Sequence, residues 1–356
     1  MTYTAVAMTH RREVAAMRVL VTGGAGYIGS LAVWRLLALG YTVTVVDSLI
    51  VGSLAAVQRA GELAGRAADL VQADIRDTDR LIRLVRETQP QAVLHFAGLK
   101  SVAESVAFPE RYYDNNVQGS LSLLRALQGS TVRRIIFSSS ATVYGQAAQA
   151  PFAETSPIEP VNPYGRSKWM VEMMLRDFCA ADPMLGAVAL RYFNPVGAHP
   201  SGRLGEWVTG APNNLLPYII GVVQGRFERV RVFGGDYPTP DGSGVRDYIH
   251  VLDLVEGHCA ALRAGTGFSV YNLGTGVGYS VHDMIRAMQA VCARPIPHEV
   301  VERRPGDVAV SIADPTRARQ CLGWQAQYDL MAMCRDAWRF AENNPMGYAS
   351  AGSAAN

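Results

Sequence analysis

Lysine is almost absent from this 356-residue sequence, which has Lys100 and Lys168 as its two lysines among 33 basic residues. The simplest explanation is a general bias toward arginine. A lysine retained against that bias suggests a site that needs a slim ammonium rather than a planar guanidinium. Chance retention is the alternative, so the surroundings of each lysine become important.

Cysteine is also scarce and scattered. The five cysteines form no Cys-x-x-Cys pair and no Cys/His cluster at zinc-binding spacing, so we predict no disulfide framework and no metal site. Such thiols are typical of a reduced, cytoplasmic protein. No apolar run reaches the ~18 residues that a membrane-spanning helix needs. Residues 1–16 lack the apolar core of a signal peptide. We therefore expect a cytoplasmic protein that makes no membrane contact, with Met17 as an alternative start.

An excess of one charge is missing as well. The 33 basic residues are balanced by 31 acidic ones, which leaves a net charge of +2, and no long basic run appears. Nonspecific nucleic-acid binding needs concentrated positive charge, so nucleic acid is not an expected partner. Local arginines can still bind small anionic ligands.

The first part of the sequence alternates regularly between strand-like and helix-like segments. Short β-branched runs indicate buried parallel strands, and longer periodic segments indicate helices. Strands are predicted over residues 18–22, 42–46, 92–96, 134–138 and 187–192. Helices are predicted over residues 30–39, 81–88, 117–128 and from near 164 to 180. This alternation predicts an α/β fold of the Rossmann type, a doubly wound parallel sheet with helices on both faces.

The composition changes after Asn194. Residues 197–214 and 234–247 are rich in Gly, Pro, Asp and Asn and are predicted to be loops. Helices follow at residues 281–292 and 331–341. Long loops in a compact protein are usually functional.

Four parts are therefore predicted along the chain. An N-terminal extension covers residues 1–16, and a Rossmann domain covers 17–194, to which the chain can return later. A smaller α/β C-terminal part covers 195–348, and a disordered tail covers 349–356.

A cofactor site is predicted between the first strand and the first helix. Gly23, Gly26 and Gly29 permit a tight turn and the close approach of a pyrophosphate to the helix N-terminus. The next strand ends in Asp47, whose carboxylate can accept hydrogen bonds from both ribose hydroxyls and would repel a 2′-phosphate. We therefore predict NAD rather than NADP. The alternative is a glycine turn that binds no ligand. Asp74, after a further strand-like run, could bind the adenine amino group, and a solvated turn carboxylate is the alternative for it.

A catalytic site is predicted around Tyr164 and Lys168, which are four residues apart and share a helical face. A free tyrosine has a pKa of about 10, too high for a base at neutral pH. A nearby ammonium and a positive nicotinamide both favour the phenolate. Ser140 ends a strand, where parallel sheets collect ligands, and could hydrogen-bond the reacting oxygen. A chance Tyr-x-x-x-Lys match is the alternative.

These motifs resemble those of the extended short-chain dehydrogenase/reductase family, and within it those of the UDP-glucose 4-epimerases. The resemblance spans roughly residues 17–348 and rests on segments 21–29, 95–100, 112–117, 137–145, 191–198 and 244–251. It implies NAD contacts from Gly23, Gly26, Tyr27, Ile28, Gly29, Asp47, Asp74, Ile75, Phe96, Ala97, Gly98, Lys100, Asn115, Ser140, Tyr164, Lys168 and Phe193.

The same resemblance implies a UDP-sugar substrate and reversible inversion at C4 of UDP-glucose and UDP-galactose through a 4-keto intermediate. The implied substrate contacts are Ser140, Thr142, Tyr164, Asn194, Asn213, Asn214, Leu215, Arg231, Val232, Phe233, Arg246, Arg304, Asp307 and Ser311. Three of these are arginines, and two of them, Arg246 and Arg304, suit a diphosphate through bidentate hydrogen bonds. A lone surface arginine would more often form an ion pair with a neighbouring carboxylate.

Ser311 departs from the family pattern, because some members carry a bulky tyrosine at this pocket position. The smaller serine predicts room for an N-acetyl group and hence action on UDP-N-acetylglucosamine and UDP-N-acetylgalactosamine. A polar surface residue that does not touch the sugar is the alternative.

Three other functions are considered. A nucleotide-sugar 4,6-dehydratase needs an acid/base pair beside the catalytic serine, where this chain has Ala141 and Val143. A 4-epimerase of UDP-pentoses or UDP-hexuronates is harder to separate. A nonenzymatic NAD-sensing protein would not need Tyr164 and Lys168 together. The resemblance also implies a homodimer that contacts through helix 117–128 and the helix starting at Tyr164.

Overall fold

The computed structural model describes residues 17–146, 149–208, 210, 212–304 and 306–348. The predicted N-terminal extension and the predicted tail lie outside these residues.

The chain forms two compact units that interleave along the sequence. The first comprises the described residues up to Ser139, Asn162–Leu190 and His258–Val270. The second comprises the described residues of Ser140–Val161, Arg191–Gly257 and the chain from Tyr271 onward.

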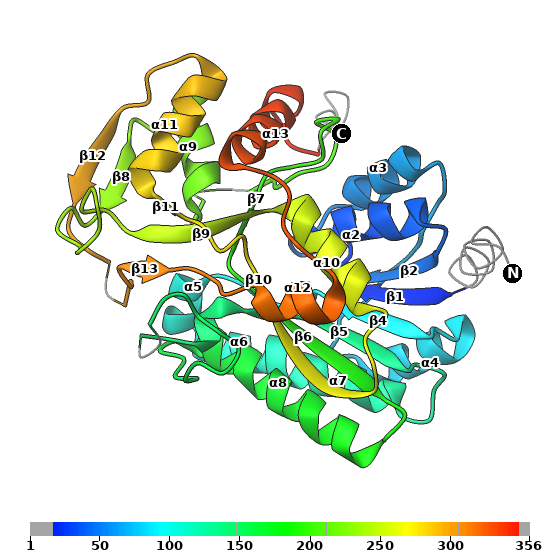
Figure 1. Ribbon diagram of the computed structural model, residues 1–356. Coiled ribbons are helices and arrows are strands. Elements are labelled where there is room, and N and C mark those ends of the chain that lie inside the picture. Colours follow the sequence, from blue (N-terminus) through cyan, green and yellow to red (C-terminus); the bar gives the residue numbers. More distant parts are fainter. Residues whose placement is uncertain (1–16, 147–148, 209, 211, 305, 349–356) are drawn as a thin grey trace, which may run out of the picture. The chain divides into compact units, whose positions relative to one another are not determined.

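A seven-stranded sheet supports the first unit (Figure 1). Its strands are β1 (Arg18–Thr22), β2 (Thr42–Asp47), β3 (Asp69–Gln72), β4 (Ala92–His95), β5 (Arg134–Ser140), β6 (Gly186–Tyr192) and β10 (Gly267–Leu273). They lie in the order β10-β6-β5-β4-β1-β2-β3. The pairs β1–β2, β2–β3, β1–β4 and β4–β5 are parallel.

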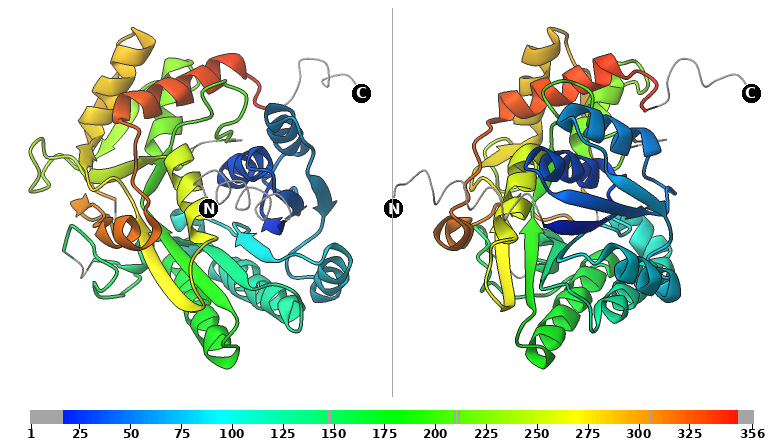
Figure 2. Two further views of the ribbon diagram at one scale, coloured as in Figure 1. Left: turned by 45° about the vertical axis from the view of Figure 1, so that its right-hand side comes forward. Right: turned by 90° about the vertical axis from the view of Figure 1, so that its right-hand side faces the viewer.

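Helices cover both faces of this sheet, with α2 and α3 on one face and α4, α7 and α8 on the other (Figures 1 and 2). The helices are α2 (Tyr27–Ala38), α3 (Leu54–Ala64), α4 (Thr78–Thr88), α5 (Val102–Ala107), α6 (Pro109–Tyr112), a π-helix over Tyr113–Gln118, α7 (Gly119–Leu127) and α8 (Pro163–Ala181). Leu81, Leu123 and Val171 from the second face share one buried core with Leu20 and Val93 of the strands. Burial of this apolar surface holds the sheet and helices together.

In the second unit, β9 (Val245–His250) pairs with β7 (Asn194–Val196), β11 (Gly278–Ser280) and β13 (Val310–Ser311), and β8 (Val230–Phe233) pairs with β12 (His298–Val301). The remaining elements are a 3₁₀ turn (Ala141–Val143), α9 (Leu215–Val223), α11 (Val281–Cys292), α12 (Thr316–Leu322) and α13 (Leu330–Asn343), together with the first part of α10 (Val251–Ala261), whose residues from His258 on belong to the first unit. Ile219, Met284, Met333 and Val232 form part of a second buried core, which joins α9, α11 and α13 to β8.

The predicted fold class is confirmed, and the helix predicted over residues 281–292 has the expected bounds. The loop prediction was wrong at residues 245–247, which belong to β9. The polar residues Arg246 and Asp247 made this segment look like a loop in the sequence. It forms a strand because it pairs with distant segments. The helix predicted over 30–39 begins earlier, at Tyr27, and the one over 117–128 starts as a π-helix.

Candidate active site

The glycine turn joins β1 to α2 as predicted. Gly26 is the N-cap of α2, so Tyr27 and Ile28 begin the helix. A Cβ added to Gly29 would lie 2.1 Å from Gly23 O, so only glycine fits there. A Cβ on Gly26 would have its nearest contact, the same oxygen, at 3.4 Å. The packing of the protein therefore requires glycine at 29, whereas at 26 it leaves room beside the helix N-terminus for a phosphate.

Asp47 ends β2 and is 7 % exposed. Its Oδ2 accepts a hydrogen bond from Ala25 N at 2.9 Å, and its Oδ1 accepts one from Leu49 N at 2.9 Å. The Ala25 contact holds the carboxylate against the glycine turn, and the Leu49 contact joins it to the loop after β2. Each carboxylate oxygen has further acceptor capacity for a ribose hydroxyl.

Asp74 follows β3 and is engaged by Arg76, whose Nη2 lies 2.6 Å from Asp74 Oδ2. The Arg76 hydrogen bond holds the pKa of Asp74 below its ordinary value. Arg76 also forms an ion pair with Asp114, which precedes the predicted cofactor residue Asn115. Ile75, which lies between Asp74 and Arg76 in the sequence, is buried. Arg76 therefore links the predicted adenine segment to the π-helix that carries Asn115.

The loop after β4 carries Phe96, Ala97, Gly98 and Lys100, of which Gly98 and Lys100 are exposed. The ring of Phe96 lies 4.7 Å from that of His258, centroid to centroid.

Asn116 holds this loop and was missed by the sequence reasoning. Its Oδ1 accepts from Leu99 N at 2.8 Å, and its Nδ2 donates to Leu99 O and to Ser167 Oγ, each at 3.0 Å. The adjacent Asn115 is half-buried, whereas Asn116 is 3 % exposed. The Asn-Asn pair was visible in the sequence, but which asparagine faces inward was not.

Tyr164 and Lys168 lie on one face of α8, as predicted. Asn162 caps this helix by accepting a hydrogen bond from Gly165 N at 2.9 Å. Lys168 Nζ lies 5.8 Å from the centroid of the Tyr164 ring and donates to Ser138 O at 2.8 Å. Burial lowers the pKa of Lys168 to about 8. The ammonium thus lies close to the phenol ring, and burial shifts its pKa toward neutral pH.

His95 is a second buried group near Lys168 that the sequence reasoning did not assign. Its ring nitrogens pair with Thr22 Oγ1 at 2.6 Å and Ser120 Oγ at 2.9 Å. Burial, with a smaller effect from Lys168, lowers the pKa of His95 to about 3. The imidazole is therefore neutral at physiological pH.

Ser140 and Thr142 lie together in the second unit. Ser140 Oγ accepts hydrogen bonds from Thr142 N at 3.2 Å and from Thr142 Oγ1 at 2.9 Å. Tyr144 follows them, and its hydroxyl donates to Asn272 Oδ1 at 2.6 Å. Phe193 is buried, with its ring centroid 6.1 Å from that of Phe152.

Seven of the predicted UDP-sugar residues occupy three places in the second unit. Asn194 begins β7, the exposed Asn213 and Asn214 precede Leu215 at the start of α9, and Arg231, Val232 and Phe233 lie on β8.

The structure brings the arginines of this set next to other predicted residues. The guanidinium carbon of Arg304 lies 3.8 Å from the centroid of the Phe233 ring. Asp307 N donates to Arg304 O at 3.3 Å, which closes a turn. The parallel register of β13 and β9 places Ser311 opposite Arg246.

Asp247 stabilises this arrangement and was not assigned from the sequence. It is fully buried and accepts hydrogen bonds from Thr275 N and Oγ1, Gly276 N and Ala313 N. Burial raises the pKa of Asp247. Its contacts tie β9 to the loop after β10 and to the end of β13.

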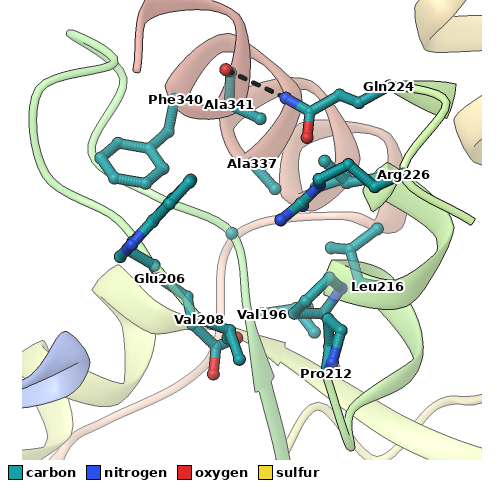
Figure 3. A pocket seen from close by; sticks show the side chains of 14 residues that line it. Val196, Glu206, Val208, Pro212, Leu216, Gln224, Arg226, Ala337, Phe340 and Ala341 are labelled. Atoms are coloured by element: carbon teal, nitrogen blue, oxygen red, sulfur yellow. Dashed lines mark hydrogen bonds between the residues drawn. The ribbon is translucent and has the colours of Figure 1, made fainter. Parts of the chain in front are cut away.

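A cavity in the second unit lies among β7, α9 and α13 and encloses about 530 Å³ of space, including its open mouth (Figure 3). Val196, Leu216 and Phe340 supply apolar walls, and Gln224 Nε2 donates to Ala341 O at 3.3 Å. Val196 is two residues after Asn194, and Leu216 follows Leu215. The cavity therefore adjoins predicted substrate segments along the chain, but none of its lining residues was predicted to bind substrate.

Within the described residues, no group of three or more His, Cys, Asp or Glu side chains could hold a metal ion. No helix in this described part of the chain is long and apolar enough to span a membrane.

Comparisons with known proteins show which family the chain belongs to. The family described as GDP-mannose 4,6 dehydratase matches residues 20–337. UDP-glucose 4-epimerase of Bacillus subtilis is 49% identical over 338 residues, which cover 94% of this chain and 100% of the relative.

Two solved structures are similar over nearly the whole chain. UDP-glucose-4-epimerase from Stenotrophomonas maltophila, with bound NAD and formylated UDP-arabinopyranose, has a TM-score of 0.90 and 48% identity, covering 92% of this chain and 99% of that one. The Bifidobacterium longum enzyme, in complex with NAD+ and UDP, has a TM-score of 0.90 and 46% identity, covering 93% and 100%. The chain therefore belongs to the family described as GDP-mannose 4,6 dehydratase and, by its identity to these relatives, to the UDP-glucose 4-epimerases.

Proposed function

We propose that this chain is an isomerase that reversibly inverts C4 of UDP-glucose and UDP-galactose through a 4-keto intermediate, with NAD as its cofactor. The observation that carries the proposal is the pair Tyr164 and Lys168, with the ammonium 5.8 Å from the phenol ring, in the same unit as the glycine turn and Asp47.

The first unit is the proposed NAD-binding part. The helix N-terminus at Gly26 would take the pyrophosphate, and Asp47 would accept the ribose hydroxyls. When bound, NAD supplies a reversible hydride acceptor for C4. Among the other predicted contacts, Asp74 is proposed to bind the adenine amino group, and Lys100 is proposed to lie near the cofactor phosphates and ribose.

Tyr164 is the proposed base. Its phenolate removes the proton of the 4-hydroxyl as the C4 hydride leaves, so a ketone forms and the phenol becomes protonated. The charge on Lys168 stabilises the phenolate. Ser140 and Thr142 are proposed to hydrogen-bond the sugar oxygen. After the sugar presents its other face, the proton and hydride return to give the epimer.

The second unit is the proposed UDP-sugar part. Arg246 and Arg304 would bind the diphosphate through charge-assisted hydrogen bonds. Strand β8 would pair with the uracil edge. Firm binding of UDP with loose binding of the hexose lets the ketone turn without release.

Substrate breadth follows from Ser311, which lies opposite Arg246 on neighbouring strands. We propose that this small side chain leaves room for a 2-N-acetyl group, so that the N-acetylated pair of UDP-sugars is also interconverted.

The proposed assembly is a homodimer that contacts through the 117–128 segment and α8, in a reducing cytoplasm. Met170 and Met173 support the contact because they are 36% and 40% exposed on α8. Analytical ultracentrifugation tests it, since Met173→Glu should shift the protein toward monomer.

The activity is tested by incubating the purified protein with a panel of UDP-hexoses, UDP-pentoses, UDP-hexuronates and N-acetylated UDP-sugars, and resolving the products. Tyr164→Phe should keep NAD and fold but lose at least roughly a hundredfold in turnover. Near-normal turnover in that variant would contradict the assignment of the base. Conversion of pentoses or hexuronates alone would contradict the assignment of the sugar.

A further inference from the structure

A buried carboxylate lies one helical turn after Lys168, and the chemistry proposed above does not use it. Glu172 is fully buried on α8 and lies four residues after Lys168, so both side chains share a helical face. Ser139 Oγ donates to Glu172 Oε1 at 2.5 Å. Lys168 Nζ donates to Ser138 O at 2.8 Å. Lys168 and Glu172 of α8 thus hold two consecutive residues near the end of β5.

The charge of Glu172 offsets part of the cost of burying the Lys168 ammonium. An ionised group is retained inside a protein when opposite charge and hydrogen bonds replace its lost hydration. Burial lowers the pKa of Lys168, and the charge of Glu172 acts in the opposite direction. Removal of the carboxylate would therefore leave burial to lower the pKa of the ammonium further.

The other groups that face Lys168 cannot replace this negative charge. On β4, His95 is neutral because burial lowers its pKa to about 3. On β5, the Phe137 ring centroid lies 4.9 Å from Nζ and offers a cation–π contact. On α8 itself, Tyr164 supplies the phenol whose ionisation the ammonium is proposed to favour.

We propose that Glu172 is a positioning residue whose carboxylate keeps the Lys168 ammonium charged, holds the end of β5 through Ser139, and thereby sets the alkaline limit of turnover. This inference rests on the proposed role of Lys168. As the pH rises and the ammonium loses its proton, the neutral amine no longer stabilises the Tyr164 phenolate, so turnover falls. Ser140, the next residue after Ser139, depends on the same strand end for its place.

The scarcity of lysine makes a direct test practical. Protein labelled with ¹³C at lysine Cε has two lysine side chains to report, and Lys100→Arg assigns their signals. Glu172→Gln keeps the side-chain shape and an acceptor for Ser139 but removes the charge. The NMR titration midpoint of Lys168, expected near 8 in the unaltered protein, should fall by about one pH unit in Glu172→Gln. Glu342→Gln, at an exposed position on α13, is the matched control and should leave the midpoint unchanged.

Kinetics supply the second readout. The alkaline limb of kcat for UDP-galactose should move to lower pH with the NMR midpoint, whereas KM should stay unchanged because the predicted UDP contacts are untouched. An unchanged Lys168 midpoint in folded Glu172→Gln would overturn the proposal. A shifted midpoint with an unmoved alkaline limb would overturn its link to turnover.

The proposed function and the role of Glu172 can fail separately. Absence of epimerase activity in the unaltered protein would refute the proposed function. The Lys168 midpoint would still test the effect of Glu172 in that case. If Glu172→Gln does not fold, Glu172→Asp and the unaltered protein decide. A Glu172→Asp midpoint equal to or above that of the unaltered protein overturns the proposal.

Discussion

Alanine substitutions at Gly26 and Gly29 should separate cofactor binding from packing in the glycine turn. At Gly29, the new Cβ would lie 2.1 Å from Gly23 O and 2.8 Å from Gly24 Cα, both of which are backbone atoms. At Gly26, the nearest atom would be 3.4 Å away, and the backbone angles, φ −79° and ψ 178°, are extended values that alanine adopts.

The two variants should therefore fail in different ways. Overpacking against backbone that cannot move aside should reduce the free energy of unfolding of Gly29→Ala by about 1–3 kcal/mol or more. Gly26→Ala should change this free energy by less than about 1 kcal/mol, because an N-cap glycine loses only its capping preference. Its methyl group should instead meet the pyrophosphate, where a clash of about 1–3 kcal/mol weakens NAD binding roughly 10–100-fold.

Two assays distinguish these effects. Thermal unfolding of protein stripped of nucleotide measures packing, and about 2–4 °C of lost Tm corresponds to 1 kcal/mol in a unit of this size. Titration of the stripped protein with NAD measures affinity. The reasoning is refuted if Gly26→Ala binds NAD as tightly as the unaltered protein, or if stripped Gly29→Ala unfolds at the unaltered temperature.

Three further predictions address the cofactor, the sugar pocket and the core. Protein purified without added NAD should release about one nucleotide per chain on denaturation, and dependence on NADP instead would contradict the prediction for Asp47. Ser311→Tyr should abolish turnover of UDP-N-acetylglucosamine and spare UDP-galactose, because steric exclusion acts on one substrate; an unaltered protein that is inactive on N-acetyl sugars would show the inference from side-chain size to be wrong. Tyr144→Phe should lower the free energy of unfolding in urea by about 1–3 kcal/mol, since it removes the hydroxyl that donates to buried Asn272; an unchanged value would mean that water or another donor replaces it.

The elements around the glycine turn could be predicted because their signals are short-range. The strand Arg18–Thr22, the turn after it and Asp47 at the end of the next strand all lie where the sequence placed them. The shared face of Tyr164 and Lys168 needs only the helical repeat. Local periodicity and glycine chemistry contain this information, and the family resemblance added the proposed roles.

Tertiary structure alone decided which distant segments meet. Lys168 binds Ser138, 30 residues earlier, and Glu172 binds Ser139, 33 residues earlier. Pairing with β7, β11 and β13 made a strand of residues that look like a loop, and put Ser311 opposite Arg246. Periodicity specifies which side of a segment is apolar but not which segment it packs against. The shifted pKa of Lys168 also depends on tertiary structure, because burial and neighbouring charge exist only once those segments have come together.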